Sequence, residues 1–272
     1  MTPEVEGRRA AEQFRREHGL GDQPLGDLVA IIERTTGIDV AVLDVGADEH
    51  GLTMRDPKRG AVFIAVAKTA NPMRQRSSLA HELAHVLFED WIDNSDEGWG
   101  ERTHQEVRAD AFARHLLIPL AGVRGFVDDH LEVIDHSTLS DVVQYFLVSP
   151  AMAAIVMEQA GHITEAIKDG WMCVTTPALA ARFGWSDQYR ALQASSNLRR
   201  APQKLLTRAI QGYLKNVVSL QTLATLRGVD ATTIEQELIE DGLFPESLTV
   251  EWAGPASLPE LDLDLSELDE AY

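Results

Sequence analysis

The five residues His81-Glu82-Leu83-Ala84-His85 constrain this chain more than any other stretch of its sequence. Asn71-Pro72 is typical of a helix start, and apolar residues then recur at helical spacing through Leu87, so the five residues fall inside a predicted helix. Residues four apart in a helix lie one turn apart on the same face. Two imidazoles placed in this way can both reach one metal ion at about 2.0–2.1 Å.

Glu82 lies directly after the first histidine of this HExxH pattern. A glutamate at that position can hold and deprotonate a metal-bound water, whose pKa a zinc ion lowers to about 7. The competing interpretation is an amphipathic helix that exposes two histidines and binds nothing. We regard it as the weaker one, because 9 histidines in 272 residues make a chance match uncommon.

A catalytic zinc also needs a third protein ligand and an open fourth position. Glu106 and Asp110 are spaced i, i+4 on the next predicted helix, from about Glu101 to Leu117. Glu106 can supply the carboxylate ligand, and Asp110 can accept the ring N–H of a ligating histidine and so fix its orientation. His104 and His115 lie about 200° and about 180° around this helix from Glu106, so neither shares its face. By themselves, two acidic residues would indicate only a solvated helix face.

These two motifs together resemble the ImmA/IrrE family of metallopeptidases. RSSLAHELAHVLF is followed by EVRADAFARHLLIP, and the second stretch matches an E-x-x-A-[ND]-x-F-A-x-x-L-L-x-P helix over residues 106–119. The resemblance covers about residues 5–160. His115 departs from the family pattern, which more often has a small or acidic residue at that position.

The resemblance implies a set of roles for the residues of these motifs. The ligands that it implies for one zinc ion per chain are His81, His85 and Glu106. It also implies that Glu82 is the catalytic acid/base and that Asp110 orients a histidine, in the first instance His81. Manganese or iron also suits two imidazoles and a carboxylate, so the native metal stays open.

The resemblance also implies a class of substrate, because members of this family cleave helix-turn-helix repressors of phage, mobile-element or stress-response genes. We therefore predict a zinc-dependent metallo-endopeptidase, a hydrolase acting in transcription regulation, whose substrate is a helix-turn-helix repressor. The alternative is a non-proteolytic DNA- or protein-binding regulator with a structural or degenerate metal site. A structural zinc would more often be closed by four protein ligands, which favours the protease. Spacing does not choose among the candidates for stabilising the oxyanion, which are Tyr145, His104 and Arg114.

The remaining pattern predicts an α+β fold. We expect a helical N-terminal domain with a small three-stranded sheet and the HExxH helix, followed by an all-helical C-terminal extension. The expected strands are Ile38–Leu43, Gly51–Arg55 and Ala61–Ala67. An exposed edge of this sheet, with Ala61–Ala67 as the candidate strand, would suit an extended substrate segment.

Four segments are predicted along the chain. They are a metallopeptidase domain at residues 1–125, a helix-turn-helix-like helical subdomain at 126–170, a basic helical extension at 171–250 and an acidic tail at 251–272. We expect the acidic tail to be disordered until it meets a partner. Within the second segment, Ala151–Gln159 contains no lysine or arginine to meet phosphates, which favours a packing or protein-contact role over DNA reading.

The formal net charge of −19 argues against general nucleic-acid binding. Residues 171–227 nevertheless carry a net charge of +7 and residues 228–272 a net charge of −13. The basic segment is therefore the candidate for contact with nucleic acid, although charge runs usually form a solvated face. A third interpretation is that the acidic tail lies on this basic surface or over the metal cleft.

The single cysteine, Cys173, excludes an internal disulfide and indicates a reducing compartment. The N-terminal residues lack the apolar core of a secretory signal. No run approaches the roughly 18 apolar residues that a membrane span needs. We therefore expect a cytoplasmic protein that does not contact membranes.

Overall fold

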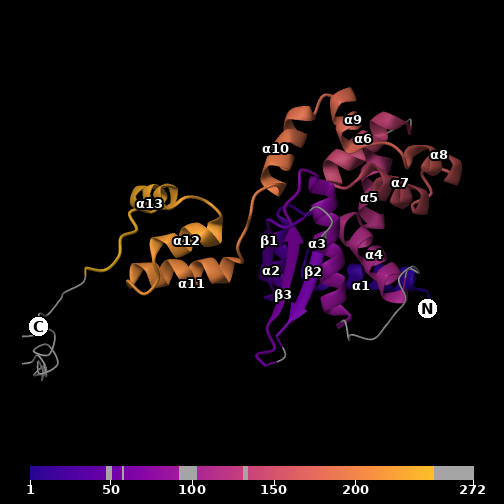
Figure 1. The fold of residues 1–272 in the computed structure, drawn as a ribbon. Helices are drawn as coiled ribbons and strands as arrows, with labels where there is room; N and C mark the ends of the chain where they lie inside the picture. Colours follow the sequence, from indigo (N-terminus) through magenta and orange to yellow (C-terminus); the bar gives the residue numbers. More distant parts are fainter. Residues whose placement is uncertain (47–50, 57, 92–102, 131–133, 248–272) are drawn as a thin grey trace, which may run out of the picture.

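The computed structural model of the chain describes residues 1–247, with the exception of residues 47–50, 57, 92–102 and 131–133 (Figure 1). Most of the described residues are in helices, and three strands form one small mixed sheet, so the predicted α+β class is confirmed. The acidic tail predicted at residues 251–272 lies outside the described residues.

The three predicted strands are confirmed to within one residue at each end. They are β1 (Asp39–Leu43), β2 (Gly51–Arg55) and β3 (Val62–Ala67). β3 pairs in parallel with β1 and antiparallel with β2, so the order across the sheet is β1-β3-β2. The prediction that Ala61–Ala67 offers a free edge is wrong, because β1 and β2 occupy both edges of β3. The outer edge of β2 pairs with no other described strand.

Helix α3 (Pro72–Leu87) lies against β2 and β3, and helix α4 (His104–Leu117) packs on α3. Helix α1 (Pro3–Glu17) packs along α4 at very close range. A Cβ atom on Gly7 would lie 2.2 Å from the Arg108 carbonyl oxygen and 2.8 Å from the Phe112 nitrogen. Only glycine therefore allows the backbones of these two helices to approach this closely, and the contact fixes where α4 lies.

Two arginines bind backbone carbonyls across these elements. Arg15 of α1 donates to the carbonyl oxygens of Gly21, Gln23 and Leu116. Arg76 of α3 donates to the carbonyl oxygens of Leu25, Gly26 and Leu147 at 2.6, 2.6 and 3.2 Å. Burial lowers the pKa of each guanidinium to about 10, which leaves both charged. Each one satisfies carbonyls that neither helix nor sheet satisfies, and so holds loops to the two helices.

One continuous hydrophobic core extends from Ala11 to Tyr189. It is enclosed by the elements already named and by the helices α2 (Leu28–Thr36), α5 (Leu120–His130), α6 (His136–Phe146), α7 (Pro150–Gln159), α8 (Glu165–Trp171), α9 (Thr176–Arg182) and α10 (Ser186–Ser196). Ala153, Ala154, Val156 and Met157 of α7 are fully buried, which confirms a packing role for this helix. No single described helix is long and apolar enough to cross a membrane; only α6 and α7 taken together pass that test, with a 106° bend between them.

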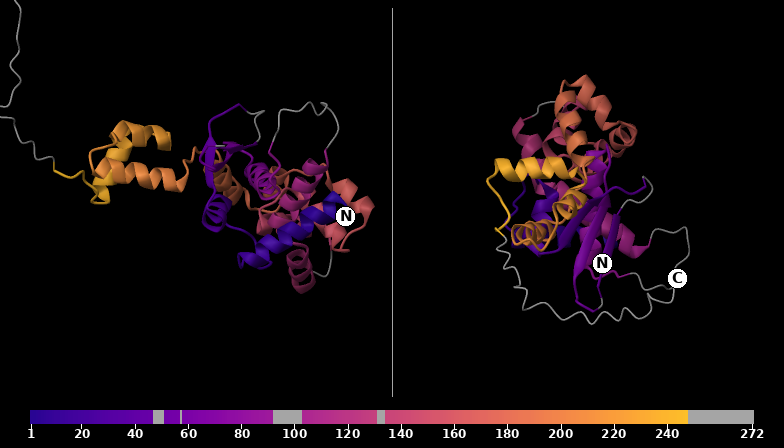
Figure 2. Two further views of the ribbon diagram at one scale, coloured as in Figure 1. Left: turned by 90° about the horizontal axis from the view of Figure 1, so that it is seen from below. Right: turned by 60° about the vertical axis from the view of Figure 1, so that its left-hand side comes forward.

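A second, smaller cluster is formed by α11 (Gln203–Leu214), α12 (Leu220–Arg227) and α13 (Ala231–Glu240). These helices stand to one side of the main body (Figure 1, and left panel of Figure 2). Their junction uses cations of the basic segment: Arg200 pairs with Asp27 at 2.7 Å and Lys204 donates to the Gly37 carbonyl at 2.6 Å. Part of the positive charge of residues 171–227 is therefore satisfied within the chain.

His115 on α4 is 1% exposed, with its Nε2 atom 3.4 Å from a carboxylate oxygen of Glu4 on α1. Burial and the neighbouring Arg114 guanidinium lower the pKa of His115 to about 4. The ring is therefore neutral in the folded protein at neutral pH.

This depressed pKa predicts a stability loss on acidification. An unfolded histidine titrates at about pH 6.5, so below that pH the unfolded chain binds a proton that the folded chain does not. The contribution of His115 to the free energy of unfolding is complete above about pH 6.5 and falls as the pH approaches 4, by up to about 3 kcal/mol. Urea titrations from pH 7 to pH 4.5 should show a shallower pH dependence for His115→Gln than for the wild type. Parallel pH profiles would contradict this assignment.

Candidate metal centre

Helix α3 places both histidines of the HExxH pattern on one face. Asn71 caps the helix by accepting a hydrogen bond from the Arg74 N–H at 3.2 Å, and Pro72 occupies its first turn. Leu79, Ala80, Leu83 and Ala84 are buried on the side that meets the core. The His81 and His85 side chains, only 20% and 15% exposed, lie on the side that meets α4, with ring centroids 4.7 Å apart.

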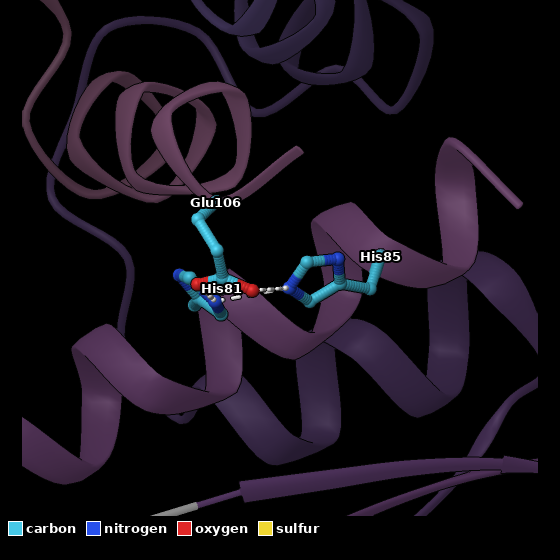
Figure 3. Close-up of side chains that lie close together, drawn as sticks. All are labelled: His81, His85 and Glu106. Carbon is cyan, nitrogen blue, oxygen red and sulfur yellow. Dashed lines mark hydrogen bonds and ion pairs between the residues drawn. The ribbon is translucent and has the colours of Figure 1, made fainter. Parts of the chain in front are cut away.

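Glu106 reaches these rings from the first turn of α4 (Figure 3). One carboxylate oxygen lies 3.3 Å from His81 Nε2 and the other 3.4 Å from His85 Nε2. The two Nε2 atoms are 3.0 Å apart. The three residues that the sequence predicts as metal ligands therefore converge on one point, each with a ligand atom within 4.8 Å of the others.

Each histidine has a carboxylate behind it. Asp110, one turn beyond Glu106, accepts a hydrogen bond from His81 Nδ1 at 3.0 Å. Asp90 accepts one from His85 Nδ1 at 3.3 Å. Because both Nδ1 atoms donate, both Nε2 atoms carry a lone pair toward Glu106.

Asp90 is a residue that the sequence reasoning missed. Glu89 takes a left-handed conformation, with φ of 55°, directly after α3 ends, and the Asp90 N–H then donates to the His85 carbonyl at 2.9 Å. This turn brings Asp90 back to the ring of His85. An acidic residue five positions after the second histidine was the available signal, but nothing in the sequence predicts a glutamate with positive φ.

Arg108 holds Asp90 in place from α4. Its guanidinium lies 2.6 Å from Asp90 and 2.8 Å from Glu6 of α1, and its Cζ lies 3.9 Å from the ring centroid of Phe88. The carboxylate behind His85 is thus connected to the same α1–α4 pair that positions Glu106.

The donor set fits a divalent cation. Two imidazole lone pairs and two carboxylate oxygens face one another at 3.0 to 3.4 Å, an arrangement that is repulsive without a positive charge between them. Ligands of a tetrahedral zinc at about 2.0–2.1 Å are themselves about 3.3 Å apart. Burial by itself lowers the pKa of His81, but the Asp110 hydrogen bond and the charges of Glu106, Asp110 and Glu82 outweigh it and raise this pKa. The site therefore attracts a cation, and a metal ion would compete with a proton for it.

Glu82 lies beside this centre on the side of the sheet. Thr53 of β2 donates a hydrogen bond to a Glu82 carboxylate oxygen at 2.7 Å. A Cβ atom on Gly51 would lie 2.5 Å from the other carboxylate oxygen, so the absence of a side chain at Gly51 makes room for this carboxylate. Both neighbours come from edge strand β2, and neither is marked by the HExxH pattern.

The three oxyanion candidates are engaged elsewhere. His104 is 53% exposed and its Nε2 lies 3.8 Å from Glu6. Arg114 pairs with Glu4 at 2.7 Å, and Tyr145 stacks on Phe126 with centroids 4.6 Å apart. Within the described part of the chain, none of the three makes a hydrogen bond or ion pair with His81, His85 or Glu106.

Comparison with known proteins places this geometry in a family. Residues 34–158 match the family model of the IrrE N-terminal-like domain, peptidase M78. The matched segment extends from the end of α2 through most of α7 and includes every residue of the candidate metal centre. No curated protein matches the chain. This match over residues 34–158 confirms the resemblance to the ImmA/IrrE metallopeptidases.

Proposed function

We propose that this protein is a zinc-dependent endopeptidase that cleaves a helix-turn-helix transcriptional repressor. The observation that carries the peptidase part is the convergence of His81, His85 and Glu106, with Glu82 beside them, inside a peptidase-family domain. The repressor and the role in transcription regulation are supported by the ImmA/IrrE resemblance. A cytoplasmic location is proposed on the single cysteine, Cys173, which is free.

The residues of the site divide the chemistry among them. A zinc ion held by the two histidines and Glu106 would supply Lewis acidity toward the scissile carbonyl and the attacking water. The Glu82 carboxylate accepts a proton from that water and delivers it to the departing amine. The Thr53 hydroxyl orients Glu82 for both transfers through its 2.7 Å hydrogen bond.

The edge of β2 is the part of the sheet best placed to hold a substrate. Thr53 of this strand touches Glu82, so an extended peptide added to the free edge of β2 would pass beside the catalytic carboxylate. Leu52 and Met54, on the other face of the strand, are 49% and 55% exposed. Strand addition supplies affinity through backbone hydrogen bonds, and the exposed side chains supply selectivity.

Substitution of the proton-transfer residue gives the first test. Glu82→Gln removes the base but keeps the shape of the side chain, so repressor cleavage should fall by at least about 100-fold while zinc binding persists. Cleavage is followed by gel electrophoresis with zinc-loaded protein, and Glu12→Gln, an exposed position on α1, is the matched control. If neither the wild type nor Glu82→Gln cleaves the repressor, yet both bind it or DNA equally, the chain is a non-proteolytic regulator.

Removal of Glu106, the proposed third ligand, gives the second test. Glu106→Gln should weaken zinc binding by more than about 100-fold. This is a larger loss than is usual for a residue that only hydrogen-bonds to a metal ligand. Competition with a chromophoric chelator measures the affinity. His104→Gln changes a polar residue one half-turn away on the same helix and should leave affinity unchanged. Equal zinc affinity for Glu106→Gln and wild type would exclude this carboxylate as a ligand.

Substitution of Asp90, the carboxylate that the sequence did not predict, gives the third test. Asp90→Asn should lower zinc affinity by about 10- to 100-fold, because His85 loses the charge that orients its ring and increases its basicity. Asp187→Asn, which removes an exposed carboxylate on α10, is the control in the same chelator assay. An Asp90 variant with wild-type affinity would show that the contact with His85 is incidental.

A further inference from the structure

A cavity of about 540 Å³ lies at the start of α3, away from the metal centre. It is open to solvent on one side and lined by the first turns of α3 and α7, by residues 174–177 at the start of α9, and by Tyr189 of α10. None of the metal-centre residues lines it. Arg74 lines the cavity and precedes His81 by seven residues, or about 10 Å along the helix axis.

Asn71, Ser149 and Thr175 in the lining of this cavity cap helices, but four other polar side chains there have no partner among the described residues. Tyr189 and Thr176 are each only 6% exposed, and their hydroxyl groups make no hydrogen bond with any described residue. The half-buried Ser77 hydroxyl and the exposed Arg74 guanidinium line the same space and are also unpaired within the described residues. Polar groups of buried residues are almost always hydrogen-bonded in native proteins, so the hydroxyls of Thr176 and Tyr189, which face this cavity, are placed to donate to a bound molecule.

The electrostatics of the cavity favour an anion. Arg74 is the one charged residue in its lining, and no carboxylate accompanies it. Helices α3 and α7, of 16 and 10 residues, begin at its wall with Asn71 and Ser149 as their caps. Their N-termini add partial positive charge to that of the guanidinium. Burial raises the pKa of Tyr189, which keeps its hydroxyl a donor.

The rest of the lining is apolar. Met73, Pro150, Val174 and Pro177 contribute hydrocarbon surface next to the donors. The volume lies within the range of about 300–1,000 Å³ that small-molecule sites occupy. An inorganic ion alone would leave this surface without contact, so the lining suits an anion with an organic body.

We propose that this cavity binds a small organic anion, a phosphate or a carboxylate attached to an apolar group. Arg74 pairs with the anionic head, the hydroxyls of Ser77, Thr176 and Tyr189 donate to it, and the apolar lining receives the body. This site is independent of the proposed peptidase activity, because it shares no residue with the metal centre.

Calorimetric titration of the full-length protein with phenyl phosphate and with benzoate tests the site. We expect saturable binding of at least one of these anions at one per chain, and the stronger one identifies the head group. Arg74→Gln should weaken binding by about tenfold or more and Tyr189→Phe by about threefold or more, as expected for charged and neutral hydrogen bonds. Arg190→Gln, beside Tyr189 but 75% exposed and outside the lining, should bind like the wild type.

Two further measurements separate this site from its competitors. Benzyl alcohol, which has the body without the charge, should bind at least about tenfold more weakly than the better anion. Binding should also survive chelation of all metal by EDTA. The proposal is overturned if neither anion binds at millimolar concentration, if benzyl alcohol binds equally well, if Arg74→Gln has no effect, or if EDTA abolishes binding and so places the anion on the metal.

Discussion

The crossing of α4 over α3 is the contact on which the site depends. Glu106 is distant in sequence from both histidines, and only this crossing brings its carboxylate within 3.3 and 3.4 Å of their Nε2 atoms. The crossing in turn depends on α1, whose backbone touches that of α4 at Gly7, where a methyl group would collide with the Arg108 carbonyl. Arg15 then ties α1 to the end of α4 through the Leu116 carbonyl. Close backbone packing between α1 and α4 thus sets the geometry of the centre.

Charged side chains of α1 and α4 also connect these helices to the two histidines. Arg108, whose carbonyl lies against Gly7 in the α1–α4 contact, joins Glu6 of α1 to Asp90 behind His85. Asp110, on the same helix, lies behind His81. Each ring is therefore oriented by a carboxylate that α4 either carries or holds, so the helix that supplies Glu106 also sets the tautomers of His81 and His85.

The local parts of the site could be predicted because they depend only on helical periodicity. His81 and His85 face the same way through i, i+4 spacing, and Asp110 lies behind His81 for the same reason on α4. Asp90 and Thr53 could not be predicted. The first requires a glutamate with φ of 55° to reverse the chain, and the second requires β2, rather than β3, to be the edge strand beside α3. Both depend on the packing of segments that are separate in sequence, which periodicity does not describe.

The sequence by itself determined which residues can do chemistry. HExxH within a capped amphipathic helix, followed by a helix with carboxylates at i and i+4, allows few alternatives, because ligand type and spacing on one helix are properties of the local chain. The tertiary structure alone decided which donors converge, which strand edge is open beside Glu82, and that three helix starts line a cavity with unpaired donors. Those features arise where segments that are distant in sequence pack together. The free energy of burying a shared core, rather than any local conformational preference, determines which segments make contact.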